Sequence, residues 1–256
     1  MTGAHAEVRF VTLTEENLDK VQLLCGHSPA FRRGYDAKAA WLQGRLKEGI
    51  RYTLLQVNGH NAGMLETVPG EYAWRGVEAQ GYLFIHCFWV VGRNRKHGYG
   101  RQLLQACLEV AREMVGVAVV TSKTHWLPTR KIFMKNGFEV ADESPPFELL
   151  VKRFKPEAPL PRFKRMVQTP LPGLTLYHSD QCPYMQNLPA IVQQVGGQLG
   201  VPVNLIQVES ARQAQNSPCP YGVLGIYYDG ELIEYRPAGT KKLLEILEPK
   251  LAGRSS

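Results

Sequence analysis

The stretch from Tyr82 to Val91 constrains the fold of this 256-residue chain more than any other feature of its sequence. It is rich in aromatic and β-branched residues and is apolar on both faces, with His86 as an interruption. Such a strand is typical of the centre of a sheet that is covered on both sides. The stretch is well short of the roughly 20 residues that a membrane span needs, so no membrane partner is expected.

The composition favours a soluble globular protein, with 44 % hydrophobic and 21 % charged residues. The formal net charge of +7 favours anionic ligands without indicating which ones. The five cysteines are odd in number and scattered, and the N-terminus lacks the pattern of a secretory signal. We therefore expect a cytoplasmic protein with reduced thiols.

Apolar periodicity predicts a mixed α/β unit over residues 1–154. The expected strands are 7–13, 51–57, 61–68, 82–91, 117–121 and 147–154, and the expected helices are 14–24, 36–47, 99–114 and 129–136. Asn58-Gly59 marks a hairpin, and His60 is expected to make its loop longer than a minimal turn.

A proline-rich segment at 155–172 predicts a stiff connector to a second unit at 173–256. The second unit is predicted to have the compact order βαβ-ββα. Its strands are expected at 174–178, 201–208, 223–228 and 231–235, and its helices at 184–199 and 240–251.

The junction between the apolar strand and the helix from Tyr99 carries the strongest functional signal. Gly98 and Gly100 let a ligand approach the backbone, and the junction holds four basic residues and no acidic one. A helix start with these properties suits a diphosphate. Leu103 stands where a dinucleotide fingerprint needs its third glycine, and no nucleotide P-loop ending follows.

The pattern Arg95-x-x-Gly98-x-Gly100 resembles the coenzyme A pyrophosphate loop of the GNAT (GCN5-related) N-acetyltransferases. The run from Ile132 to Phe138 is similar to a second signature of that family, a short helix ending in Leu-Tyr-x-Lys-x-Gly-Phe. The resemblance covers about residues 7 to 154. It implies a GNAT fold, a mixed and mostly antiparallel sheet flanked by helices.

The resemblance also implies acetyl-CoA as co-substrate and direct transfer of its acetyl group to a primary amine, on a small molecule or a peptide. Trp89, Val90 and Val91 would hold the pantetheine arm. The diphosphate would be held by Arg95, Lys96, His97, Gly98, Tyr99, Gly100 and Arg101.

One departure from the family concerns the group that protonates the leaving thiolate. In many relatives a tyrosine of the second signature is thought to give this proton, and the resemblance implies that Phe133 takes its position beside the coenzyme. A phenyl ring has no proton to give. A protein that binds or senses acyl-CoA with little turnover therefore stays open as an alternative.

The candidate general bases are His86 in the central strand and Glu66 near the end of the preceding strand. A satisfied core histidine and a solvated edge carboxylate are the structural alternatives. Cys87 is expected to point to the face opposite His86, because neighbours in a strand alternate. Tyr72, Trp74 and Arg75 could form an acceptor wall or simply pack a loop.

The second unit is similar to the thioredoxin fold, and the whole chain is similar to two-domain acetyltransferases with a YoaP-like C-terminal region. Cys182 falls where thioredoxins begin Cys-x-x-Cys, but Met185 replaces the resolving cysteine. Cys219 is the alternative partner, for redox or soft-metal chemistry, unless both cysteines are buried small hydrophobes. No separate metal site and no nucleic-acid partner are expected, and a homodimer stays open.

Overall fold

The structure is a computed structural model that describes residues 6–26, 28–124, 126–165 and 171–253. The chain divides into two units. The first contains 1–27, 39–73 and 77–163, and the second contains 28–38, 74–76 and 164–256. No sequence pattern indicated that 28–38 and 74–76 belong to the second unit. Residues 166–170 of the predicted connector lie outside the described residues.

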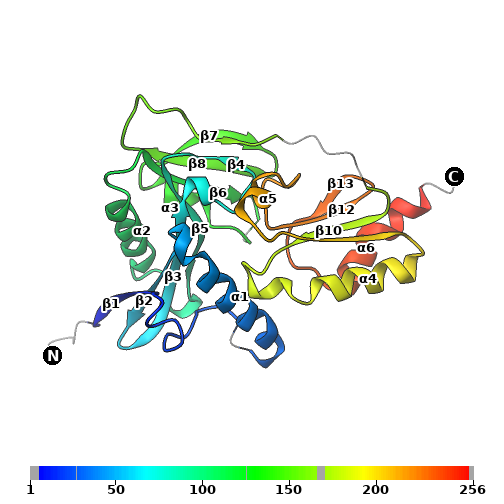
Figure 1. Ribbon diagram of the computed structural model, residues 1–256, viewed down its shortest axis with the longest axis horizontal. Helices are drawn as coiled ribbons and strands as arrows, with labels where there is room; N and C mark the ends of the chain where they lie inside the picture. Colours follow the sequence, from blue (N-terminus) through cyan, green and yellow to red (C-terminus); the bar gives the residue numbers. More distant parts are fainter. Residues whose placement is uncertain (1–5, 27, 125, 166–170, 254–256) are drawn as a thin grey trace. The chain divides into compact units, whose positions relative to one another are not determined.

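The first unit is built on a seven-stranded sheet with the order β1-β2-β3-β5-β6-β8-β7 (Figure 1). Only β5 and β6 run parallel among these neighbours, and the other pairs are antiparallel. The strands are β1 (Val8–Thr12), β2 (Arg51–Val57), β3 (His60–Pro69), β5 (Tyr82–Val90), β6 (Gly116–Ser122), β7 (Glu139–Ser144) and β8 (Phe147–Arg153). The predicted mixed, mostly antiparallel sheet is confirmed.

Helices and short segments complete this unit. The helices are α1 (Arg32–Arg45), whose first turns belong to the second unit, α2 (Tyr99–Val110) and α3 (Arg130–Met134). Single 3-10 turns lie at η2 (Leu46–Glu48), η3 (Gly70–Tyr72) and η4 (Gly92–Asn94), and the short strands β4 (Val77–Glu78) and β9 (Arg162–Phe163) pair with each other.

The helix α2 covers one face of the sheet because its apolar side chains recur at helical spacing. Leu103, Leu104 and Cys107 are buried against β3 and β5. Leu65 and Ile85 contribute to the same core from the sheet. This packing fixes the N-terminus of α2 at the end of β5, where the sequence predicts the ligand.

The predicted helix from Thr14 to Leu24 is wrong, and the chain makes turns over Glu15 to Lys20. The Asn17 side chain accepts a hydrogen bond from the Thr14 N–H at 2.8 Å and donates one to the Thr12 carbonyl at 3.1 Å. Such local side-chain bonds compete with a helical backbone. Asn17 therefore closes a turn where the sequence suggested a helix start.

The expected long hairpin loop is also wrong. Val57 pairs directly with His60, so the connection is the two-residue turn Asn58-Gly59. Both residues have positive φ, at 48° and 79°, which is the geometry of a type I′ turn. The strand β3 also contains a bulge that the sequence did not predict. Ala62 is an extra residue between the pairs Gln56–Asn61 and Leu55–Gly63.

The second unit has a four-stranded sheet with the order β11-β10-β12-β13. Its strands are β10 (Leu174–His178), β11 (Val203–Gln207), β12 (Leu224–Tyr228) and β13 (Glu231–Glu234), and its helices are α4 (Leu188–Leu199), α5 (Ala211–Gln215) and α6 (Thr240–Ala252), with 3-10 turns η1 (Pro29–Phe31) and η5 (Pro183–Met185). The two helices α4 and α6 pack together.

This order matches the predicted βαβ-ββα pattern, with α5 as an addition. The thioredoxin-like assignment remains a prediction. In the described ranges, none of the helices combines the length and the apolar character that a membrane crossing requires.

Candidate functional site

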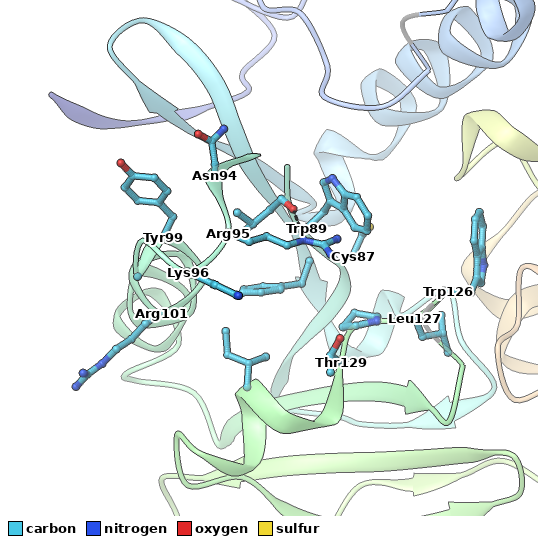
Figure 2. Close-up of a pocket in the computed structure, with 16 residues that line it drawn as sticks. Cys87, Trp89, Asn94, Arg95, Lys96, Tyr99, Arg101, Trp126, Leu127 and Thr129 are labelled. Carbon is cyan, nitrogen blue, oxygen red and sulfur yellow. Dashed lines mark hydrogen bonds between the residues drawn. The ribbon is translucent and has the colours of Figure 1, made fainter. Parts of the chain in front are cut away.

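The first unit contains a cavity where two neighbouring strands separate. The parallel ladder between β5 and β6 covers only Tyr82–Ile85 opposite Gly116–Val119. Beyond it, β5 continues beside β3 alone, and β6 continues beside β8. A cavity of about 460 Å³ opens beside the last residues of β5 (Figure 2). A strand whose ladder has ended can offer backbone groups to an extended ligand.

The N-terminus of α2 forms one end of this cavity. Gly98 is the N-cap residue, with a φ of 82°, and no side chain caps the helix there. The first turn carries no acidic residue. Lys96 also adopts positive φ, at 68°, so the loop turns sharply before the helix begins. The backbone and the nearby cations make this end of the cavity favourable for an anion.

Most of the residues predicted to hold coenzyme do line the cavity. They are Trp89, Val90, Arg95, Lys96, Gly98, Tyr99, Gly100 and Arg101. Val91 and His97 do not: the Val91 N–H donates to the Ala62 carbonyl at 2.9 Å, and His97 stacks on Tyr99. Figure 2 shows the Arg101 side chain pointing outwards from α2, so its charge acts from the rim.

Arg95 lies across the end of β5 (Figure 2). Its guanidinium carbon is 4.9 Å from the centre of the Trp89 ring, and its Nε donates to the Val90 carbonyl at 3.3 Å. Trp89 is 43 % exposed, which is high for a residue of this strand. The cation and the ring together form the outer edge of the cavity.

The opposite wall was largely missed from the sequence. It is formed by the segment that follows β6, namely Trp126, Leu127, Pro128, Thr129 and Ile132. The available signal was topological, because segments that follow two neighbouring parallel strands lie at the same edge of the sheet. Of these residues, only Ile132 belongs to a motif that the sequence offered, the second family signature.

Glu66 on β3 and His86 on β5 are brought together near the end of β5. The His86 Nδ1 lies 3.2 Å from a Glu66 carboxylate oxygen, and both side chains are fully buried. An ionised carboxylate only accepts hydrogen bonds, so with Glu66 ionised this contact would be donated by Nδ1–H.

The expectation that Cys87 points away from His86 is wrong, because β5 contains a bulge. Thr67 pairs with Ile85 and Glu66 pairs with Cys87, so His86 is an extra residue opposite the ladder. Ile85 and Phe88 both pack towards α2, which confirms that the alternation shifts between them. Cys87 lines the cavity, next to the buried Glu66–His86 pair.

Tyr52 lies beside this pair, as the cross-strand partner of Glu66. Burial raises the pKa of Tyr52 well above its usual range, and the nearby Cys25, Glu66 and Cys87 add to the effect. Its hydroxyl oxygen accepts a hydrogen bond from the Leu24 N–H at 2.9 Å. Tyr52 therefore remains a neutral phenol at physiological pH.

Phe133 is fully buried and does not line the cavity. Its ring packs edge-on against Phe88 and Phe138, with centroid distances of 5.7 Å and 5.2 Å. The ring belongs to the core under α2. It supports the cavity through Phe88, and it offers the ligand no contact of its own in this structure.

The two cysteines of the second unit differ in environment. Cys219 is fully buried, and burial raises its pKa to about 12 despite hydrogen bonds from Tyr227 and from the Tyr221 and Gly222 N–H groups. Cys182 is half-buried and lies directly before the 3-10 turn η5, so it does not begin a long helix. The two thiols are not joined in a disulfide, and within the described ranges no group of three or more metal-ligating side chains occurs.

The residues of the expected acceptor wall fall into different units. Trp74 and Arg75 are buried in the second unit, where Arg75 donates to Gln181 at 3.2 Å and stacks on Tyr221. Tyr72 belongs to the first unit and is exposed. For Trp74 and Arg75, the structure therefore favours the interpretation that they pack a loop over the interpretation that they form an acceptor wall.

Two segments of the chain match known protein families. Residues 18–138 match the acetyltransferase (GNAT) family, and residues 202–243 match the YoaP-like family. A GNAT family domain is thus shown for residues 18–138, and a YoaP-like region for residues 202–243. A Bacillus subtilis (strain 168) protein called "Uncharacterized N-acetyltransferase YoaP" is 26 % identical over 247 residues, covering 93 % of this chain and 98 % of that protein.

Solved structures resemble part of the chain. The PaiA N-acetyltransferase from Thermoplasma acidophilum in complex with coenzyme A is 13 % identical, with a TM-score of 0.43 over 58 % of this chain and 99 % of that one. A GNAT family acetyltransferase from Brucella melitensis in complex with acetyl-CoA is 12 % identical, with a TM-score of 0.39 over 61 % of this chain and 94 % of that one.

Proposed function

We propose that the first unit transfers the acetyl group of acetyl-CoA directly to a primary amine. The observation that carries this proposal is the cavity between the separated ends of β5 and β6, which runs to an uncapped helix N-terminus. The family assignment of residues 18–138 supports the same reaction class.

The residues at the cavity fit an elongated ligand with a diphosphate. The main chain of Phe88 to Val90 would hold the amide groups of a pantetheine arm, as an added strand would be held. The start of α2, with Lys96 and Gly98, would hold the diphosphate. A Cβ on Gly100 would come within 3.0 Å of Ile132, so the glycine keeps this part of the cavity open.

The reaction needs an uncharged amine nitrogen to attack the acetyl carbonyl carbon. The new C–N bond forms as the C–S bond breaks, and coenzyme A leaves as a thiolate. No covalent intermediate on the enzyme is required. The protein's main contribution is to align the two reactants, since correct positioning alone can supply much of the rate enhancement.

The Glu66–His86 pair is the proposed proton acceptor. Nδ1 is held by the carboxylate, and Nε2 would take the amine proton through a water molecule, because both side chains are fully buried. Glu66 stabilises the imidazolium that forms. The bulge at His86 supports this role because it turns the imidazole and Cys87 towards the same side of the strand.

The leaving group is proposed to depart without a tyrosine acid. Phe133 cannot donate a proton, and its ring lies in the core. A thiol has an ordinary pKa of about 8.5, so its thiolate is an adequate leaving group at neutral pH. The same observation keeps the binding or sensing alternative testable, since that alternative predicts coenzyme binding without turnover.

A thiol-release assay with acetyl-CoA and a panel of primary amines tests the proposal. We expect at least one amine to accelerate thiol release, with an N-acetylated product seen by mass spectrometry. We expect the rate of thiol release to fall strongly in Gly98→Val. Gly98 has a φ of 82°, and a β-branched side chain disfavours this left-handed conformation. The matched control is Gly44→Val on α1, where an added Cβ meets nothing within 4 Å. Coenzyme binding with no acceleration by any amine would favour the sensing alternative.

A further inference from the structure

A second cavity of the first unit has the character of an anion-binding site. Its volume is about 620 Å³, and it is lined by Arg9, Lys20, His60 and Arg93 together with neutral residues. In the part of the chain that the structure describes, no aspartate or glutamate lines it. The Arg9 Nε donates to the neutral Gln56 at 2.7 Å, so this contact leaves the arginine charge without compensation.

The cavity shares a face of the sheet with the Glu66–His86 pair. On β2, Tyr52 and Gln56 point to the same side, because they are four residues apart in a regular strand. Tyr52 is the cross-strand partner of Glu66, whereas Gln56 lines the basic cavity. The helix α2 covers the opposite face.

The rise per residue along β2 gives the distance between the basic cavity and the Glu66–His86 pair. Four residues at about 3.3 Å each place Gln56 about 13 Å from the row that holds Glu66. The end of β5 connects them, since Cys87 and Trp89 line the coenzyme cavity, Val91 lines the basic one, and alternate residues of a strand lie on one face. A molecule that reaches both places must be extended.

We propose that the basic cavity binds an acidic group of the acceptor, and that the acceptor is an extended acidic peptide. This inference rests on the proposed amine transfer, because the amine would lie beside the Glu66–His86 pair. An extended chain covers about 3.3–3.6 Å per residue, so the carboxylate should lie about four residues from the reacting amine. Arg9 and Lys20 act as specificity-determining residues for this group.

The test uses octapeptides with a free N-terminal amine, a C-terminal fluorophore and a single glutamate at position 2, 5 or 8. Each has a counterpart with glutamine at the same position. Binding to the full chain is measured by fluorescence anisotropy with coenzyme A present. We expect the position-5 glutamate peptide to bind about fivefold more tightly than its glutamine counterpart. This preference should vanish at 1 M salt, where the Debye length is about 3 Å.

The double variant R9Q/K20Q should abolish the preference, and K241Q on α6 of the second unit is the control for loss of an exposed lysine. Equal binding of glutamate and glutamine peptides, no peptide binding at all, or a preference that survives in R9Q/K20Q would overturn the inference. Selective binding without acetylation would support the basic cavity and count against the proposed transfer. Acetylation at equal rates for all peptides would support the proposed transfer and count against the basic cavity as a binding site for the acidic group.

Discussion

Replacing Glu66 by glutamine separates a catalytic role of the Glu66–His86 pair from a structural one. The carboxylate oxygen and the His86 Nδ1 are 3.2 Å apart, and both side chains are fully buried. An amide has the same shape as a carboxylate and can still accept the Nδ1–H bond. It cannot stabilise an imidazolium by charge, so E66Q removes only the electrostatic part of the contact.

The two roles predict different magnitudes. General base catalysis typically contributes a factor of about 10² to 10⁴, so kcat should fall within that range in E66Q. The free energy of unfolding should change by only about 1 kcal/mol, since the hydrogen bond is kept. That corresponds to a Tm shift of roughly 2–4 °C for a protein of this size. E66A removes the partner of a buried imidazole and should cost about 3 kcal/mol or more.

The assay combines steady-state thiol release with thermal unfolding of both variants. Because E66Q keeps the fold, its loss of kcat should occur at unchanged affinity for acetyl-CoA. A value of kcat within a few-fold of the unmodified enzyme would refute the reasoning, and Glu66–His86 would then be a satisfied core pair.

Three further results are expected from the contacts described above. F133Y should lower Tm without raising kcat, because a hydroxyl buried without a partner costs about 1–3 kcal/mol; a gain in kcat would show that the ring can reach the leaving group. Cys219 should resist alkylation at pH 8 while Cys182 reacts, because burial raises the Cys219 pKa to about 12; mass spectrometry would contradict this if Cys219 were modified first or joined to Cys182. Burial acts to raise the pKa of Glu234, but hydrogen bonds from Arg236 outweigh it, and the pKa is lowered overall. R236Q removes these stabilising bonds, so it should reduce Tm by up to a few degrees at pH 7. A carboxylate with a lowered pKa stabilises the fold at pH values above its ordinary pKa of about 4.3, and this stabilisation is lost as the pH falls through the lowered pKa. A Tm difference between R236Q and the unmodified chain that grows in acid would therefore contradict the assignment.

The sequence was most informative where one local signal dominated. The apolar run at 82–91 and the glycines at 98 and 100 sufficed to place a central strand, a loop and a helix end. The pairing of β5 with β6, and hence the separation that opens the cavity, depends on long-range contacts. No local pattern near Trp126 or Thr129 reveals that these residues form its far wall.

The errors have local physical causes. Asn17 bonds to Thr12 and Thr14 and closes a turn where an amphipathic helix was expected. The bulge at His86 shifts the side-chain alternation, which reversed the expected direction of Cys87. Bulges follow from the register with a neighbouring strand, so sequence periodicity along a single strand does not reveal them.

Isothermal titration calorimetry of acetyl-CoA binding tests the central claim most directly. We predict that the unmodified chain and G44V bind with the same affinity, and that G98V binds at least about tenfold more weakly, because a β-branched side chain at this position would disfavour the left-handed backbone at the start of α2. Undiminished affinity in G98V, or no binding by the unmodified chain, would contradict the account.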